Sequence, residues 1–145
     1  MPALFRRQKK ETGPSRLEHL ETMFEALGNG QGFLEFDADK TVISANKMFL
    51  TWAGYEPEEV LGKDSNMFLF PEQRGPEAEK AFWGQLLAGK TVSDKFRMRA
   101  KGEREWYFYG TFYPIIDRAG KYSRFVLIGA EFTAVIVAKR EADER

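Results

Sequence analysis

The segment 105–115 has no charged face, and this feature restricts the fold more than any other in the chain. If it forms a β-strand, alternate side chains point to opposite sides. One side receives Trp106, Phe108, Gly110 and Phe112, and the other receives Tyr107, Tyr109, Thr111 and Tyr113. A strand with one face in water alternates apolar with charged residues. The sequence therefore predicts a sheet that is covered on both faces.

Further strands and short helices are predicted on both sides of this segment. Strands are expected at 33–36 and 41–44, joined by a turn at 37–40, and again at 91–98 and 122–132. Short helices are expected between the first two strands and the later three, after Asn46, at Pro57 and from Pro76. Strand runs that are separated from a helical cluster predict an α+β fold, with helices on one face of an antiparallel sheet.

A polar leader, residues 1–14, precedes a predicted flanking helix at 15–28. Ser15 is placed to cap the first turn of this helix, and Gly28 is placed to end it. Apolar residues recur along the helix at spacings of three and four, namely Leu17, Leu20, Phe24 and Leu27. This stripe and the doubly apolar sheet both need a covering surface. We therefore predict that the four residues form the interface of a homodimer.

The charge balance and the absence of cysteine exclude several classes of function. Lys and Arg together number 22, as do Asp and Glu, so the chain has no basic stripe for nucleic acid. Without cysteine there is no disulfide, thiolate metal site or cysteine nucleophile, and no metal site is expected. No apolar run approaches the ~20 residues of a membrane span, and no secretory signal is recognisable. We expect a cytoplasmic protein.

Several segments, in their order and spacing, resemble a PAS domain. They are FLEFD at 33–37, VISAN at 42–46, GYEPEEVLGK at 54–63 and YPIID at 113–117. The likeness spans residues 30–133 and points to the N-terminal PAS domains of bacterial methyl-accepting chemotaxis and aerotaxis-type receptors. It implies a five-stranded antiparallel sheet that cups short helices around a small pocket. Residues 134–145 are then the start of an output helix.

The resemblance also bears on the cofactor. Flavin relatives that sense light carry a cysteine at or next to the position of Ser65, so a cysteinyl–flavin adduct is excluded here. Relatives that bind heme often have a histidine pair at Asp64-Ser65, whereas the only histidine of this chain, His19, lies on the flanking helix. Heme ligation is therefore not supported. Non-covalent FAD, as in some aerotaxis-type relatives, is the candidate cofactor.

The residues that we place around the pocket are Trp52, Asn66, Phe82, Trp106 and Phe112. Their rings could stack on an isoalloxazine ring, and Asn66 could offer a donor and an acceptor to its polar edge. In the other interpretation these rings simply fill the interior, since the chain has 13 Phe and three Trp. Glycines inside strands, Gly110 and Gly129, leave room for a ligand or for a closely packed helix.

The expected signal junction is at Glu131 and Thr133, where many relatives carry Asp-Ile-Thr. Together these features predict a sensory and dimerisation module of bacterial signal transduction, for chemotaxis or redox sensing, that acts on a downstream signalling domain, kinase or receptor. One alternative is a cofactor-free PAS domain that docks a kinase or receptor. The other is a small α+β enzyme, but the inward strand positions offer no acid or base, so no catalytic residue is expected.

Overall fold

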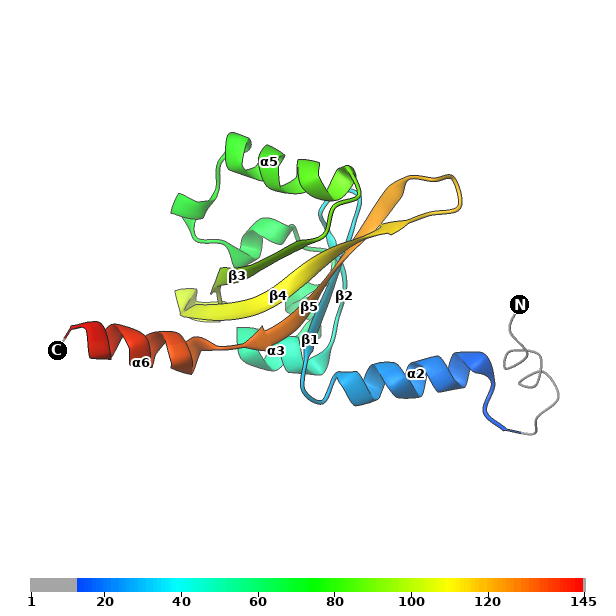
Figure 1. Ribbon diagram of the computed structural model, residues 1–145, viewed down its shortest axis with the longest axis horizontal. Coiled ribbons are helices and arrows are strands. Elements are labelled where there is room, and N and C mark those ends of the chain that lie inside the picture. The colour runs from blue at the N-terminus through cyan, green and yellow to red at the C-terminus, as the bar shows by residue number, and fades with distance from the viewer. Residues whose placement is uncertain (1–12, 145) are drawn as a thin grey trace.

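The computed structural model describes residues 13–144, apart from the side chains of residues 134 and 135. These residues form one antiparallel sheet in the order β2-β1-β5-β4-β3 (Figure 1). The strands are β1 Gly32–Asp37, β2 Val42–Ala45, β3 Val92–Arg99, β4 Glu105–Ile116 and β5 Tyr122–Glu131. The α+β fold with a five-stranded antiparallel sheet is thus confirmed. The predicted leader lies almost wholly outside the described residues.

The helices are short and end at the residues that the sequence indicates. They are α2 Arg16–Leu27, α3 Lys47–Ala53, α4 Pro57–Val60, α5 Pro76–Leu87 and α6 Thr133–Asp143, with 3-10 turns at Ser65–Phe68 (η1), Pro71–Gln73 (η2) and Lys101–Glu103 (η3). The Ser15 side chain accepts a hydrogen bond from the Glu18 amide and caps α2. Gly54 ends α3 in the left-handed conformation, with φ of 79°.

Asn46 joins α3 to the first strand. Its Oδ1 accepts hydrogen bonds from the amides of Phe33 at 2.9 Å and Phe49 at 3.0 Å. Its Nδ2 donates to the carbonyl of Gln31 at 2.9 Å. One side chain therefore caps the helix and also fixes the segment that links α2 to β1.

The core lies between the inner face of the sheet and the internal helices. Inward-facing positions of β4, Trp106 and Phe108, are nearly inaccessible to solvent and meet Phe49 of α3 edge-on. At the other end of the inner face, Phe112 contacts Phe82 and Trp83 of α5. Edge-to-face contacts of this kind add to the free energy gained from burying the rings.

A row of three glycines crosses the inner face on adjacent strands. Gly129 of β5 lies opposite Gly32 of β1 and opposite Gly110 of β4. A Cβ on Gly129 would lie 2.1 Å from the Tyr109 carbonyl oxygen, and one on Gly110 would lie 2.5 Å from the Phe108 ring. Gly110 and Gly129 therefore leave no room for a ligand, contrary to the sequence-based prediction. Instead they allow the strands and the Phe108 ring to approach closely.

The outer face of the sheet is only partly covered within one chain. Phe24 of α2 stacks on Phe33 of β1, with ring centroids 4.5 Å apart, and Phe33 is buried. Tyr109 and Tyr113 of β4 remain 55% and 43% exposed. The prediction that both faces are covered is therefore not met within the single chain, because α2 projects away from the sheet and does not lie across β4 (Figure 1).

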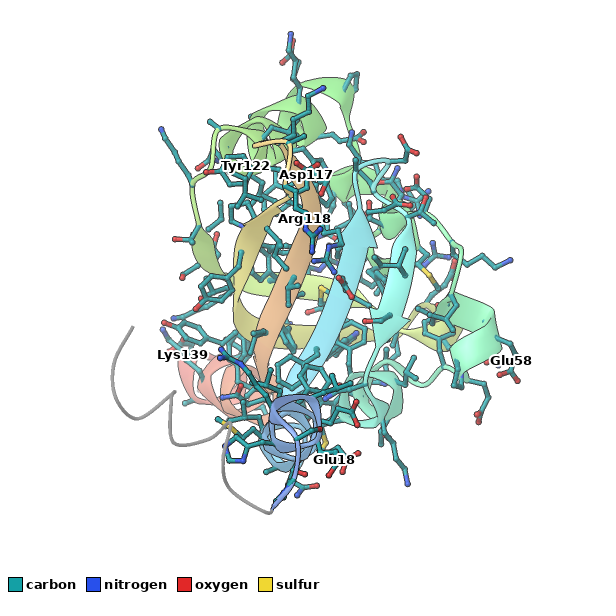
Figure 2. All side chains as sticks on the ribbon, turned by 90° about the vertical axis from the view of Figure 1, so that its right-hand side faces the viewer. Glu18, Glu58, Asp117, Arg118, Tyr122 and Lys139 are labelled. Atoms are coloured by element: carbon teal, nitrogen blue, oxygen red, sulfur yellow. The ribbon has the colours of Figure 1, made fainter. Side chains whose placement is uncertain are left out.

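The two flanking helices leave the sheet at the same end. α2 leads into β1 and α6 follows β5, and the two strands pair with Gly32 opposite Gly129. From there the helices project in opposite directions (Figure 1). In Figure 2, Glu18 of α2 and Lys139 of α6 lie toward this end, whereas Asp117, Arg118 and Tyr122 lie at the other end. No helix in the described part of the chain has the length and apolar character of a membrane span.

Candidate functional site

A cavity of about 390 Å³ lies between α5, the inner face of the sheet and the segment 65–75. Its size falls within the range of small-molecule sites, about 300–1,000 Å³. The residues that line it come mainly from the segment 65–75, from α5 and from β3, with two residues from β1 and one each from β4 and β5. The irregular segment between α4 and α5 therefore forms one wall of the cavity.

Aromatic rings form much of the apolar lining. Phe82 and Phe112 lie with ring centroids 5.0 Å apart, and Phe96 of β3 lies 5.3 Å from Phe112, both edge-on. Trp83 and Phe36 also line the cavity. Rings held by edge contacts with one another form a firm apolar surface against which a flat ligand can pack.

A few polar groups face the same space. Asn66 lines the cavity, and its carboxamide makes no hydrogen bond to any residue that the structure describes. Its donor and its acceptor are therefore both available to a ligand. Gln73 is committed elsewhere, because its Oε1 accepts from the Phe70 amide and its Nε2 donates to the Arg97 carbonyl.

Cationic residues surround the cavity. Arg74 and Lys95 line it, and neither has a carboxylate partner among residues 13–144. Lys40, by contrast, pairs with Glu79 at 2.9 Å. The lining thus combines an aromatic surface, a free carboxamide and unpaired positive charge, which suits a flat ring with polar edges and an anionic substituent.

The predicted pocket residues separate into two groups. Asn66, Phe82 and Phe112 line the cavity, together with Ser65. Trp52 of α3 and Trp106 of β4 are not among the lining residues and instead pack with Phe108 and with each other. Trp106 is 1% exposed, and its indole Nε1 has no hydrogen-bond partner in the described residues. The cavity lies toward the α5 end of the sheet, and the sequence does not indicate at which end of the sheet a cavity forms.

The predicted dimer stripe is exposed to solvent in the single chain. Leu17 is 66% exposed and Leu20 is 51% exposed, and Phe24 and Leu27 are similar. Met23, which the sequence-based prediction did not include, is 50% exposed beside them. Among these residues Phe24 also has a partner within its own chain, the ring of Phe33.

The predicted junction residues both make hydrogen bonds at the start of α6. Glu131 Oε1 accepts from the Thr133 amide at 3.0 Å. The Thr133 hydroxyl accepts from the Tyr107 amide at 2.9 Å, and the Phe132 amide donates to the Tyr107 carbonyl at 3.0 Å. The first residues of α6 are thus attached to β4 as well as to β5.

An ionic cluster on the outer face, which the sequence analysis missed, binds α6 to the sheet. Arg140 of α6 donates to Glu105 Oε1 at 3.1 Å and to the Tyr107 hydroxyl, which itself donates to Glu105. The Tyr107 hydroxyl, Arg140 and Arg97 hold the pKa of Glu105 below its ordinary value. Glu105 is therefore ionised at neutral pH. Glu105 and Arg140 are 35 positions apart in the sequence, so only the fold brings them together.

Other candidate groups have local structural roles. Glu59 Oε1 accepts from the Glu56 amide at 2.9 Å, and Glu59 also pairs with Lys101 at 2.6 Å. The backbone hydrogen bond and then Lys101 hold the pKa of Glu59 below its ordinary value. His19 is exposed on α2. Within residues 13–144, no group of three His, Cys, Asp or Glu side chains could hold a metal ion.

Known proteins share both the sequence pattern and the fold. A sequence model of the PAS fold matches residues 42–128. The biofilm dispersion protein BdlA of Pseudomonas aeruginosa is 26% identical over 120 residues, which are 83% of this chain and 29% of that protein. The chain thus spans less than a third of that relative's length.

Two solved structures share the fold. An RNA-binding light-oxygen-voltage receptor has a TM-score of 0.71 at 16% identity, over 92% of this chain and 40% of that one. A light-oxygen-voltage domain described with a flavin analogue has a TM-score of 0.64 at 22% identity, over 86% and 96% of the two chains. At these identities the structures establish similarity of fold.

Proposed function

Because this chain belongs to the PAS fold family, a family of sensory signal-transduction modules that are in general not enzymes, we propose that its cavity binds the ligand through which it senses. The supporting observation is the lining, in which the Phe82 and Phe112 rings stand beside the unpaired carboxamide of Asn66. A flavin has a flat ring with a polar edge and an anionic substituent, so it suits these groups. We therefore propose non-covalently bound flavin, FAD in particular, as the ligand, and redox sensing as the input.

The first test is the absorption spectrum of the protein as purified, followed by fluorescence titration with FAD, FMN and riboflavin. We expect flavin bands, or saturable binding, and weaker binding of riboflavin because it has no phosphate for Arg74 and Lys95. Ala78→Leu should weaken binding at least about tenfold, because Ala78 of α5 lines the cavity and a larger side chain would fill it.

Ala81→Leu is the matched control for this titration. Ala81 is an exposed residue of the same helix and is not among the lining residues. This variant should bind flavin as the parent does. If no flavin binds, or if both leucine variants bind equally well, the proposed ligand site is wrong. The favoured function would then be that of a cofactor-free interaction domain, using the exposed Tyr109 and Tyr113 side of the sheet.

We further propose that the module is a homodimer through α2. The stripe of Leu17, Leu20, Phe24 and Leu27 is at least half exposed, and Tyr109 and Tyr113 on the outer face of β4 are also exposed. A second copy of α2 would cover both. The dimer would pass the signal through α6 to a downstream signalling domain, kinase or receptor. We also propose a cytoplasmic location, which the absence of cysteine supports.

Leu20→Lys should weaken the dimer about 100-fold, measured by sedimentation equilibrium. Each buried Leu side chain contributes about 1.5–3 kcal/mol, and the substitution affects both copies. Glu25→Gln is the control, because it makes the same change of one charge on α2 outside the stripe. An unchanged dimer in Leu20→Lys, or equal weakening by the two variants, would exclude α2 as the interface.

A further inference from the structure

Arg97 is held by the segment that forms one edge of the cavity. This rim segment, residues 69–74, includes the cavity-lining residues Leu69, Gln73 and Arg74. The Arg97 guanidinium carbon lies 4.2 Å from the centroid of the Phe70 ring, and its Nη1 lies 2.9 Å from Glu72 Oε1. Gln73 Nε2 donates to the Arg97 carbonyl at 3.1 Å. A ligand that displaces the rim segment would therefore break the contacts that hold the Arg97 side chain in place.

Glu105 connects Arg97 to the output helix because its two carboxylate oxygens have different partners. Oε2 accepts from Arg97 Nε at 3.3 Å, on the cavity side. Oε1 accepts from Arg140 Nη1 at 3.1 Å, on the α6 side, and from the Tyr107 hydroxyl. The hydrogen bond to each arginine thus limits the orientations in which the Glu105 carboxylate can also bond the other arginine.

Tyr107 extends this connection to the start of α6. Its ring lies under the Arg140 guanidinium, with 5.4 Å from the guanidinium carbon to the ring centroid, and 5.9 Å from the ring of Phe132. Its amide and carbonyl bond to Thr133 and Phe132. The same residue therefore contacts both the first turn of α6 and its third turn.

We infer that Glu105 is a positioning residue that couples the rim segment of the cavity to the docking of α6. When Arg97 is in place, it holds Glu105 in the orientation that Arg140 requires. When the rim segment moves, Arg97 leaves Glu105 and the carboxylate is free to turn, so α6 undocks more often. The direction of regulation rests on the proposed function, namely that a ligand occupies the cavity. The physical coupling does not depend on that ligand.

Hydrogen–deuterium exchange of the ligand-free chain tests the coupling, with the amides of residues 137–143 as the readout. Glu105→Gln should speed their exchange about two- to fivefold, the range expected for exposed ionic contacts. Arg97 does not contact α6 in the described residues, but Arg97→Gln should also speed this exchange. In the double variant, Arg97→Gln should not speed the exchange beyond the rate in Glu105→Gln alone, because the effect of Arg97 passes through Glu105. Exchange in β5 serves as the internal reference for global stability.

Arg99→Gln is the matched control. Arg99 lies on the same strand and pairs with Glu103 at 3.0 Å, and that pair contacts neither the rim segment nor α6 in the described residues. This variant should leave α6 exchange unchanged. The coupling is wrong if Arg97→Gln behaves like Arg99→Gln, or if the effects of Arg97→Gln and Glu105→Gln multiply in the double variant.

Addition of FAD separates this inference from the proposed function. In the parent chain a bound flavin should alter the exchange of residues 137–143, and Glu105→Gln should abolish that response while still binding FAD. If FAD does not bind, the proposed ligand is wrong, and the ligand-free variants alone decide the coupling. If FAD binds and α6 responds equally in Glu105→Gln, Glu105 does not carry the signal.

Discussion

Gly129→Ala should lower the free energy of unfolding by about 3 kcal/mol, the upper range for overpacking a well-packed interior. The added methyl group would lie 2.1 Å from the Tyr109 carbonyl oxygen and 2.6 Å from the Gly110 Cα. Both are main-chain atoms of the neighbouring strand, so no side-chain rotation relieves the clash. For a chain of this size, the melting temperature should fall by about 10 °C. Thermal unfolding followed by circular dichroism measures this fall.

Gly84→Ala is the opposite case and serves as the control. Gly84 lies inside α5, and a Cβ there would meet no atom within 4 Å. Removing a helical glycine should raise stability by about 0.5–1 kcal/mol. A Gly129→Ala protein as stable as the parent would mean that β4 and β5 can separate at no cost. The glycine row would then have no role in the close packing of the sheet.

Asn46→Ala should cost about 2–4 kcal/mol of stability, measured by urea unfolding. The substitution removes the cap of α3, worth about 1 kcal/mol. It also leaves the partly buried amide of Phe33 without its 2.9 Å partner, at a cost of about 1–3 kcal/mol. Because Nδ2 also donates to the Gln31 carbonyl, the amide hydrogens of the segment between α2 and β1 should exchange faster in this variant.

Asn46→Asp separates the two roles of this side chain. The carboxylate retains the acceptor for Phe33 and Phe49 and places negative charge at the start of α3, which is favourable. The bond to Gln31 is lost, and the second carboxylate oxygen takes the place of Nδ2 opposite the Gln31 carbonyl oxygen, which it repels. Because Gln31 is exposed and the side chain can hydrate, this variant should lose about 1 kcal/mol, less than Asn46→Ala. Equal losses in the two variants would mean that the Gln31 bond, and not the capping, accounts for the stability.

Local signals in the sequence were sufficient to predict most of the elements. Ser15, Asn46 and Gly54 each mark a helix end through a hydrogen bond or a backbone conformation that depends on neighbouring residues. The alternating aromatic pattern of 105–115 likewise identified the longest strand. These signals operate over a few residues, and so a single sequence displays them directly.

The site depends on contacts that no local pattern records. The cavity forms where the segment 65–75 meets α5 and β3. The spacing of aromatic residues in the sequence does not show that Phe82 lines the cavity whereas Trp106 belongs to the core. The link from Arg97 through Glu105 to Arg140 joins three elements, and charged residues of this kind are normally solvated on the surface. Such contacts follow from the register of β3 and β4 and from the path of α6.

The pairing of β1 with β5 has a consequence for how such a unit can be combined with others. The chain enters the sheet at Gly32 and leaves it after Glu131, and Gly32 is paired with Gly129. The two strands that lead to α2 and α6 are therefore neighbours in the sheet, one inter-strand spacing, about 4.8 Å, apart. A unit attached in this way can be inserted between two helical segments, or exchanged for another of the same fold, with almost no change in their separation. Recombination of sensory inputs with different outputs then needs new connections only at the ends of two neighbouring strands.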